Sequence, residues 1–191
     1  MPPFRSVADL AAQRGVHPAE CMVDIALDSD FEQFFLQQIL NGDPSAVLEI
    51  MRHPRCIPTF SDSGAHVSQL LDSSIPTHLL GFWTRERQAF TLEAAVQKLT
   101  LAPAVAWGFH DRGMVREGLA ADLCIFDPDT ISPDMPAVAY DLPGRSARLV
   151  QKARGIAATV VNGQVLTRSG EHTGTYPGRV LRSSASRHGI G

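Results

Sequence analysis

The first fifty residues carry apolar positions at the spacing of an α-helix. Ser6, with Asp9 three residues later, is typical of a capping box, and Gly15 is placed to end the helix that they open. Pro18 fits the first position of a second helix, although the apolar run 23–27 within it suits a short buried strand equally well. The pattern predicts helices over residues 7–14, from residue 18 onward, over 31–40 and over 44–51.

A short apolar run at residues 56–60 leads directly into a cluster of turn formers at 61–64. This order predicts a strand that delivers a loop. From residue 76 to 109 the helical pattern returns, with Thr91 placed to cap a segment that Pro103 then interrupts. The pattern up to residue 109 therefore predicts mainly helix, with one short strand before the loop.

The pattern changes after Gly113, and residues 113–180 are predicted to form a small β domain. The clearest signal is Asn162-Gly163, because this pair supplies the positive φ angles of a type I′ hairpin turn. Two more strands are predicted at 114–115 and 121–126, and residues 128–155 are expected to form a long loop that packs on something. The small, polar and basic residues 181–191 are expected to be a flexible tail.

Composition narrows the possible partners. The chain has 191 residues, 44% of them hydrophobic, and a net charge of −3 without long charged runs. This charge distribution provides no basic patch that would bind nucleic acid or an anionic membrane surface. No apolar stretch approaches the roughly 18 residues of a membrane span. We predict a cytoplasmic protein without a nucleic-acid or membrane partner.

Cysteine and histidine give no local metal site. The three cysteines, Cys21, Cys56 and Cys124, form no CxxC pair and are interpreted as buried thiols. The seven histidines contain no HxH or HExxH pair, so a histidine metal site cannot arise from local spacing in this chain.

The segment Ser61-Asp62-Ser63-Gly64-Ala65-His66 resembles the amidohydrolase superfamily, in particular its D-aminoacylase-like branch, which deacylates N-acyl-D-amino acids. Residues 112–127 are similar to the family stretch RG-hydrophobic-x-x-G-x-x-ADL-x-x-FD. The other matching segments follow in the same order at 82–87, 91–104, 155–163 and 174–182. The resemblance implies an α/β fold, the C-terminal part of a (β/α)₈ metal-dependent hydrolase barrel followed by a small β-sandwich-like domain. Residues 1–112 would be the C-terminal elements of the barrel, and residues 113–180 the β domain.

The resemblance also implies a role for Asp62, which follows the predicted strand 56–60, where barrel enzymes place catalytic groups. Asp62 would be the last-strand aspartate that contacts the metal-bound water and acts as general base, so it is both the catalytic and the metal-site candidate. His66 is a candidate substrate-binding residue if the loop turns into a helix, but a packing role is as plausible. Ser61 and Ser63 are interpreted as structural turn residues.

The family's paired histidines and bridging metal ligand have no counterpart here. The resemblance implies zinc in the intact enzyme, with no zinc held by this chain alone. Its expected partners are the missing N-terminal barrel segment and an N-acyl amino acid substrate. The chain would be the product of a truncated or split reading frame, or an inactive remnant.

Two other functions stay open. One is a cyclic amidase resembling hydantoinase or dihydroorotase, and the other is a non-catalytic remnant that acts as an interaction module. Four residues either line a pocket for an acyl chain or a carboxylate, or simply cover a helix surface; they are His78, Trp83, Arg85 and Arg87. His110 beside Asp111 is interpreted as part of a polar turn without a catalytic role.

Overall fold

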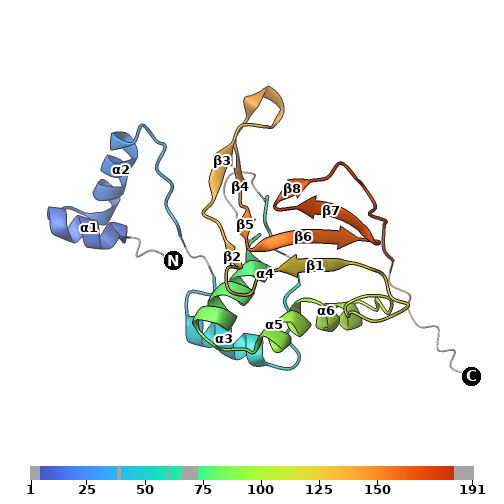
Figure 1. Ribbon diagram of the computed structural model, residues 1–191. Helices are drawn as coiled ribbons and strands as arrows, with labels where there is room; N and C mark the ends of the chain where they lie inside the picture. Colours follow the sequence, from blue (N-terminus) through green and yellow to red (C-terminus); the bar gives the residue numbers. More distant parts are fainter. Residues whose placement is uncertain (1–4, 38–39, 60, 66–72, 183–191) are drawn as a thin grey trace, which may run out of the picture. The chain divides into compact units, whose positions relative to one another are not determined.

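The computed structural model describes residues 5–37, 40–59, 61–65 and 73–182, in two compact units, Met1–Pro44 and Ser45–Gly191 (Figure 1). The first unit contains helices α1 (Val7–Arg14) and α2 (Pro18–Asp28). The Ser6 hydroxyl accepts a hydrogen bond from the Asp9 N–H at 3.0 Å, and Gly15 ends α1 with φ 69°. The predicted start and end of α1 are confirmed, and residues 23–27 are helix rather than strand.

The helix predicted over residues 31–40 is wrong for the part of it that is described, 31–37 and 40. Asp30 and Phe31 have φ angles of 51° and 62°, so the chain leaves α2 in the left-handed region and does not start a new helix. Phe31 and Leu36 are 73% and 80% exposed. Helical spacing alone did not suffice because a short helix needs a packed apolar face for stability.

The helices of the second unit agree only in outline with the prediction. α3 (Pro44–Arg52) is confirmed, while the predicted helical region 76–109 is divided among α4 (Ile75–His78), η1 (Leu79–Glu86), α5 (Leu92–Leu99) and α6 (Leu101–Ala106). η1 is a π-helix, in which the Thr84 hydroxyl donates to the Leu79 carbonyl at 2.9 Å. Thr91 caps α5 as predicted, by accepting from the Ala94 N–H. The break before α6 falls at Thr100, and Pro103 lies inside that helix.

A four-stranded antiparallel sheet has the order β1 (Leu123–Phe126), β6 (Ile156–Val161), β7 (Gln164–Arg168) and β8 (Glu171–His172) (Figure 1). Asn162 and Gly163 join β6 to β7 with φ angles of 47° and 78°, which confirms the predicted hairpin turn. The strand predicted at 121–126 is confirmed over β1, whereas residues 114–115 are not a strand. Residues 56–59 are not a strand either, and residue 60 lies outside the described residues.

The long loop predicted over residues 128–155 is wrong, because it contains two strand pairs. β2 (Ser132–Pro133) pairs with β5 (Ala153–Arg154), and β3 (Ala137–Ala139) pairs with β4 (Arg148–Val150), on either side of the short 3-10 helix η2 (Pro143–Arg145). Strands of two or three residues are too short to show periodicity. Their pairing is decided by contacts that are distant in sequence.

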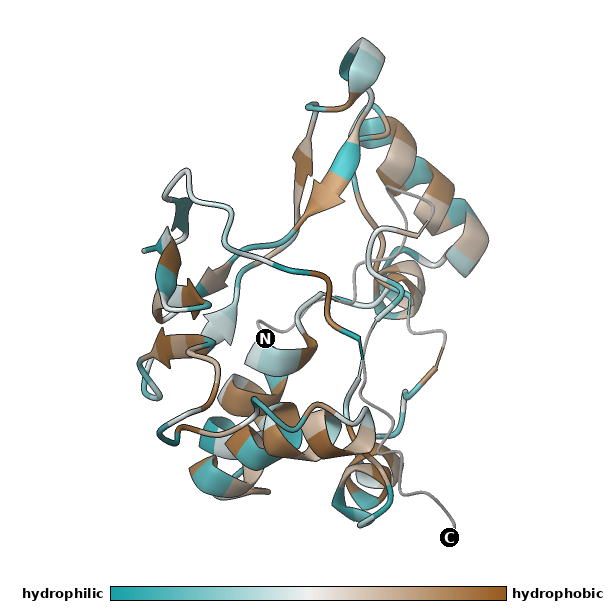
Figure 2. Ribbon diagram, turned by 90° about the vertical axis from the view of Figure 1, so that its right-hand side faces the viewer, coloured by the Kyte–Doolittle hydropathy of each residue, from teal (hydrophilic) through white to brown (hydrophobic). Residues whose placement is uncertain are grey.

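The core of the second unit joins its helices to the β region. It consists of buried Leu79, Leu80, Trp83, Ala95 and Ile131. Gly81 permits the close approach, since a Cβ atom there would lie 2.7 Å from the Ile131 carbonyl oxygen. Figure 2 shows apolar and polar residues on the same helices, as expected of helices that bury one face. No helix among the described residues is both long and apolar enough to cross a membrane.

Candidate functional site

Asp62 lies in a tight turn that its own backbone closes. The Asp62 carbonyl accepts from the Ala65 N–H at 2.9 Å, and the Ser61 hydroxyl accepts from the Ser63 N–H at 3.3 Å. Gly64 takes φ 88° in the same turn, a conformation that side chains disfavour. Ser61 thus has the structural role expected of it. Neither of these hydrogen bonds uses the Asp62 side chain.

The Asp62 side chain is exposed, and no described residue donates a hydrogen bond to its carboxylate or pairs with it. The other predicted site residue, His66, lies outside the described residues. Among residues 5–37, 40–59, 61–65 and 73–182, no three His, Cys, Asp or Glu side chains come together to hold a metal ion. The described donor set therefore does not fit a zinc site by itself, because such sites take three or four protein ligands.

The residues considered for an acyl or carboxylate pocket form a packed aromatic stack. The ring of Phe82 lies 4.9 Å from the His78 ring in parallel and 5.1 Å from the Trp83 ring edge-on, while the Arg87 guanidinium lies 5.1 Å from the Phe82 ring centre. Burial lowers the pKa of His78, against the opposing charge of Glu86. This arrangement supports a packing role for these side chains.

Arg85 also binds protein rather than facing an open pocket. Its Nη1 atom donates to the Ile131 carbonyl at 2.7 Å and to the Pro128 carbonyl at 3.3 Å. Arg85 thereby fixes the π-helix to the turn that follows β1. A substrate carboxylate would have to compete with both carbonyls for this nitrogen.

His110 and Asp111 form no dyad in the structure. Asp111 instead binds Arg112 through both carboxylate oxygens, at 3.0 and 3.1 Å. The hydrogen bonds from Arg112 lower the pKa of Asp111, so this carboxyl is ionised at neutral pH. The interpretation of this pair as a structural polar turn fits these contacts.

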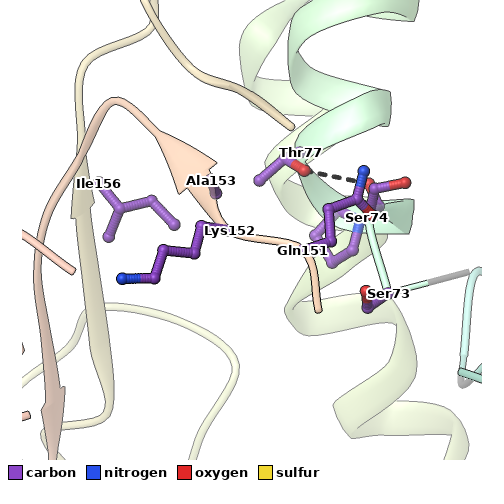
Figure 3. A pocket seen from close by; sticks show the side chains of 8 residues that line it. Ser73, Ser74, Thr77, Gln151, Lys152, Ala153 and Ile156 are labelled. Atoms are coloured by element: carbon purple, nitrogen blue, oxygen red, sulfur yellow. Dashed lines mark hydrogen bonds between the residues drawn. The ribbon is translucent and has the colours of Figure 1, made fainter. Parts of the chain in front are cut away.

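Two surface pockets lie away from Asp62. A pocket of about 240 Å³ lies between α4 and β5, where Gln151 and Ser74 face it (Figure 3). The Gln151 amide nitrogen donates to the Asp134 carbonyl at 2.8 Å, and its buried Oε1 has no hydrogen-bond partner among the residues that the structure describes. A second pocket of about 300 Å³ is lined by residues 108–111 and by Leu181 and Arg182. In the first pocket the Lys152 ammonium pairs with Glu171 at 3.6 Å rather than with a lining hydroxyl, and the second pocket is lined by no serine, threonine or cysteine. Neither pocket therefore shows a nucleophile activated by a base.

Sequence comparison decides the family. The chain matches the profile of the amidohydrolase family over residues 1–167. The chain belongs to this family. Among curated relatives, N-acyl-D-glutamate deacylase of Alcaligenes xylosoxydans xylosoxydans is 35% identical over 147 residues, which are 75% of this chain and 28% of the relative. D-aminoacylase of the same organism is 33% identical over 108 residues, 56% of this chain and 20% of the relative.

A solved structure shows a related fold. A D-aminoacylase mutant in complex with copper chloride matches with a TM-score of 0.54 and 24% identity, over 93% of this chain and 34% of that one. At this identity the match shows a shared fold alone. The present amidohydrolase chain spans about a quarter of the length of the two deacylases named above.

The family resemblance also contained residues whose importance was missed from the sequence. Arg112 and Asp122 belong to the matching stretch 112–127, and Asn162 to the stretch 155–163. In the structure Asp122 contacts both Arg112 and Asn162. An arginine and an aspartate in matching segments were the available signal, but their separation of ten residues gave no reason to pair them.

Proposed function

We propose that this chain is the C-terminal part of a metal-dependent hydrolase of N-acyl-D-amino acids, in which a (β/α)₈ barrel is followed by a small β-sandwich-like domain. The observation that carries the proposal is the family match over residues 1–167 together with relatives that are named as deacylases of acylated D-amino acids. The reaction would be hydrolysis of a linear amide bond in a cytoplasmic enzyme. The division at residues 112 and 113 into barrel elements and β domain is part of this proposal.

Asp62 is the proposed catalytic carboxylate. A carboxylate within hydrogen-bond reach of the attacking water can accept its proton as the oxygen adds to the amide carbonyl. It can then return the proton to the leaving nitrogen, which would otherwise depart as a strongly basic amide anion. The exposed Asp62 side chain has no partner among the described residues, which is compatible with this role. His66 is proposed to contact the substrate.

Zinc would be held elsewhere in the complete enzyme, with Asp62 adding at most one ligand. A D-aminoacylase structure concerned with a binuclear metal center matches this chain over 34% of that protein, at 24% identity. The described residues of the present chain group no three metal-binding side chains. The histidine ligands would therefore come from the portion of the family fold that this chain does not match.

That portion is also the proposed partner of this chain. Large apolar side chains are exposed in both units, including Phe31 and Leu36 in the first and Val115, at 89% exposure, in the second. Exposed apolar surface favours association with other protein surfaces. We propose that the remaining barrel elements cover part of it, so that the chain alone tends to self-associate.

The test is to fuse this chain to the complementary N-terminal part of N-acyl-D-glutamate deacylase and to compare the fusion with the chain alone. The fusion should bind zinc, measured by elemental analysis, and hydrolyse N-acetyl-D-glutamate in preference to the L-isomer. The chain alone should bind no stoichiometric zinc and show no hydrolysis. Stoichiometric zinc with deacylase activity in the chain alone would contradict the proposal. Hydrolysis of hydantoin or dihydroorotate in its place would favour a cyclic amidase, and a folded but inactive fusion would favour a remnant.

A further inference from the structure

Two aspartates bind one guanidinium in the second unit, and one of them also binds a residue of the hairpin turn. We call this cluster the Arg112 junction; it consists of Asp111, Arg112, Asp122 and Asn162. The Arg112 side chain is only 15% exposed although it is charged. Its Nε and Nη2 atoms bind Asp111, and its Nη1 atom binds Asp122. A mostly covered guanidinium with two carboxylate partners is a specific arrangement, because arginine can donate in several directions at once.

Asp122 extends the junction to the β hairpin. One carboxylate oxygen binds Arg112, and the other accepts from the Asn162 N–H at 2.8 Å. The Asn162 side chain in turn donates to the Pro177 carbonyl at 2.7 Å. The hairpin turn thus connects through Asp122 to the guanidinium on one side and to the segment after β8 on the other.

Backbone contacts follow the same route. The Ala120 N–H donates to the Asp111 carbonyl at 2.8 Å and closes the loop 111–120, and the Gly163 N–H donates to the Ala121 carbonyl at 3.0 Å. Gly113, with φ 91°, packs so tightly on α6 that a Cβ atom would lie 2.7 Å from the Ala104 Cβ. The loop therefore lies against α6 at one end and against the hairpin turn at the other.

We propose that Arg112 is a positioning residue that makes the loop 111–122 and the hairpin turn 162–163 open and close as one unit. When Arg112 holds Asp122, the second oxygen of Asp122 is aimed at the Asn162 N–H. Without the guanidinium, the Asp122 carboxylate can rotate into solvent, and the hairpin turn loses its side-chain anchor. The loop loses the same contact between Arg112 and Asp122, so the turn and the loop then both open more readily.

Hydrogen exchange of single amides in the full 191-residue chain tests this proposal. The Asn162 and Gly163 amides report the turn, and the Ala120 amide reports the loop. In Arg112→Lys, which keeps the charge but loses the paired donors, we expect all three amides to exchange at least about tenfold faster, with a larger effect in Arg112→Ala. Arg148→Lys is the matched control, because Arg148 also binds an aspartate, Asp141, through two donors at 2.6 and 2.7 Å. It should leave these amides within about twofold of the parent.

The outcomes are distinguishable even if Arg112 variants fold poorly. Asp111→Asn removes only the more exposed carboxylate and should accelerate the same three amides by a smaller factor while circular dichroism stays unchanged. Acceleration of Ala120 alone, with Asn162 and Gly163 unchanged, would overturn the proposal. Equal acceleration in Arg148→Lys would also overturn it, because the effect would then belong to general stability.

Discussion

Asp62 and Asp122 both lie in segments that resemble the amidohydrolase family, yet their surroundings are opposite. Asp122 uses both oxygens, one for Arg112 and one for the Asn162 N–H. Asp62 is exposed and has no bonding partner among the described residues. A carboxylate that has both oxygens hydrogen-bonded, as Asp122 has, plays a structural role through those contacts. This difference is the basis on which catalysis is proposed for Asp62 and positioning for the Arg112 junction.

The largest expected effect is the loss of catalytic turnover when Asp62 is changed. In the active fusion, Asp62→Asn keeps the shape of the side chain but removes its ability to accept a proton. General acid–base catalysis contributes about 10²–10⁴-fold, so kcat for N-acyl-D-amino acid hydrolysis should fall at least about a hundredfold.

The matched control is Asp129→Asn, because Asp129 is also exposed but lies far along the chain from the turn that contains Asp62. It should retain near-parental turnover. Circular dichroism and zinc content of both variants must match those of the parent fusion. Near-parental turnover in a folded Asp62→Asn fusion would show that Asp62 is not the catalytic carboxylate. The contrast between Asp62 and Asp122 would then have no functional meaning.

A smaller effect is expected at the hairpin turn that Asp122 anchors. Gly163 has φ 78°, and a Cβ atom there would be 4.0 Å from its nearest neighbour, Ala121. The site therefore has space, and the cost of Gly163→Val comes from backbone strain of about 1–2 kcal/mol, more for a β-branched residue. We expect the Tm to fall by several degrees.

Gly178→Val is the control for this strain, since Gly178 has open space and no positive φ. It should leave the Tm nearly unchanged. Equal Tm values for the Gly163 and Gly178 variants would mean that the turn is not under the backbone constraint described above.

The smallest effect concerns a third carboxylate, Asp127, which resembles Asp122 in being engaged. Its oxygens accept from the Asp129 N–H at 2.9 Å and the Thr130 hydroxyl at 2.8 Å, and these bonds lower its pKa below the usual 3.8. A carboxyl group whose pKa is lowered in the folded state stabilises the protein at pH values above its ordinary pKa. This stabilisation is lost as the pH falls through the lowered value. Asp127→Asn should therefore reduce the Tm slightly at pH 7, and the difference should shrink in acid below about pH 3.8. A Tm difference that is constant between pH 7 and pH 3 would assign the effect to packing.

The sequence was informative wherever one local interaction decides the structure. Ser6 and Gly15 mark the start and end of α1, and Thr91 caps α5, both as predicted. Asn162-Gly163 forms the hairpin turn, also as predicted. Each of these effects acts within a few residues. The ordered motifs around Asp62 also indicated the family, which the match over residues 1–167 shows. Asp62 and His66 as site residues remain predictions.

Tertiary structure decided what depends on distant neighbours. The strand pairs within residues 128–155 exist because they find partners about ten to twenty residues away, and residues 31–37 are not helical where their apolar side chains find no packing surface. Distant neighbours also decide which cysteines are buried. Cys21 is buried as predicted, whereas Cys124 is exposed on β1. The sequence placed Arg112, Asp122 and Asn162 in family motifs, but only the fold could join them, since a guanidinium selects its partners by position in space and not by separation along the chain.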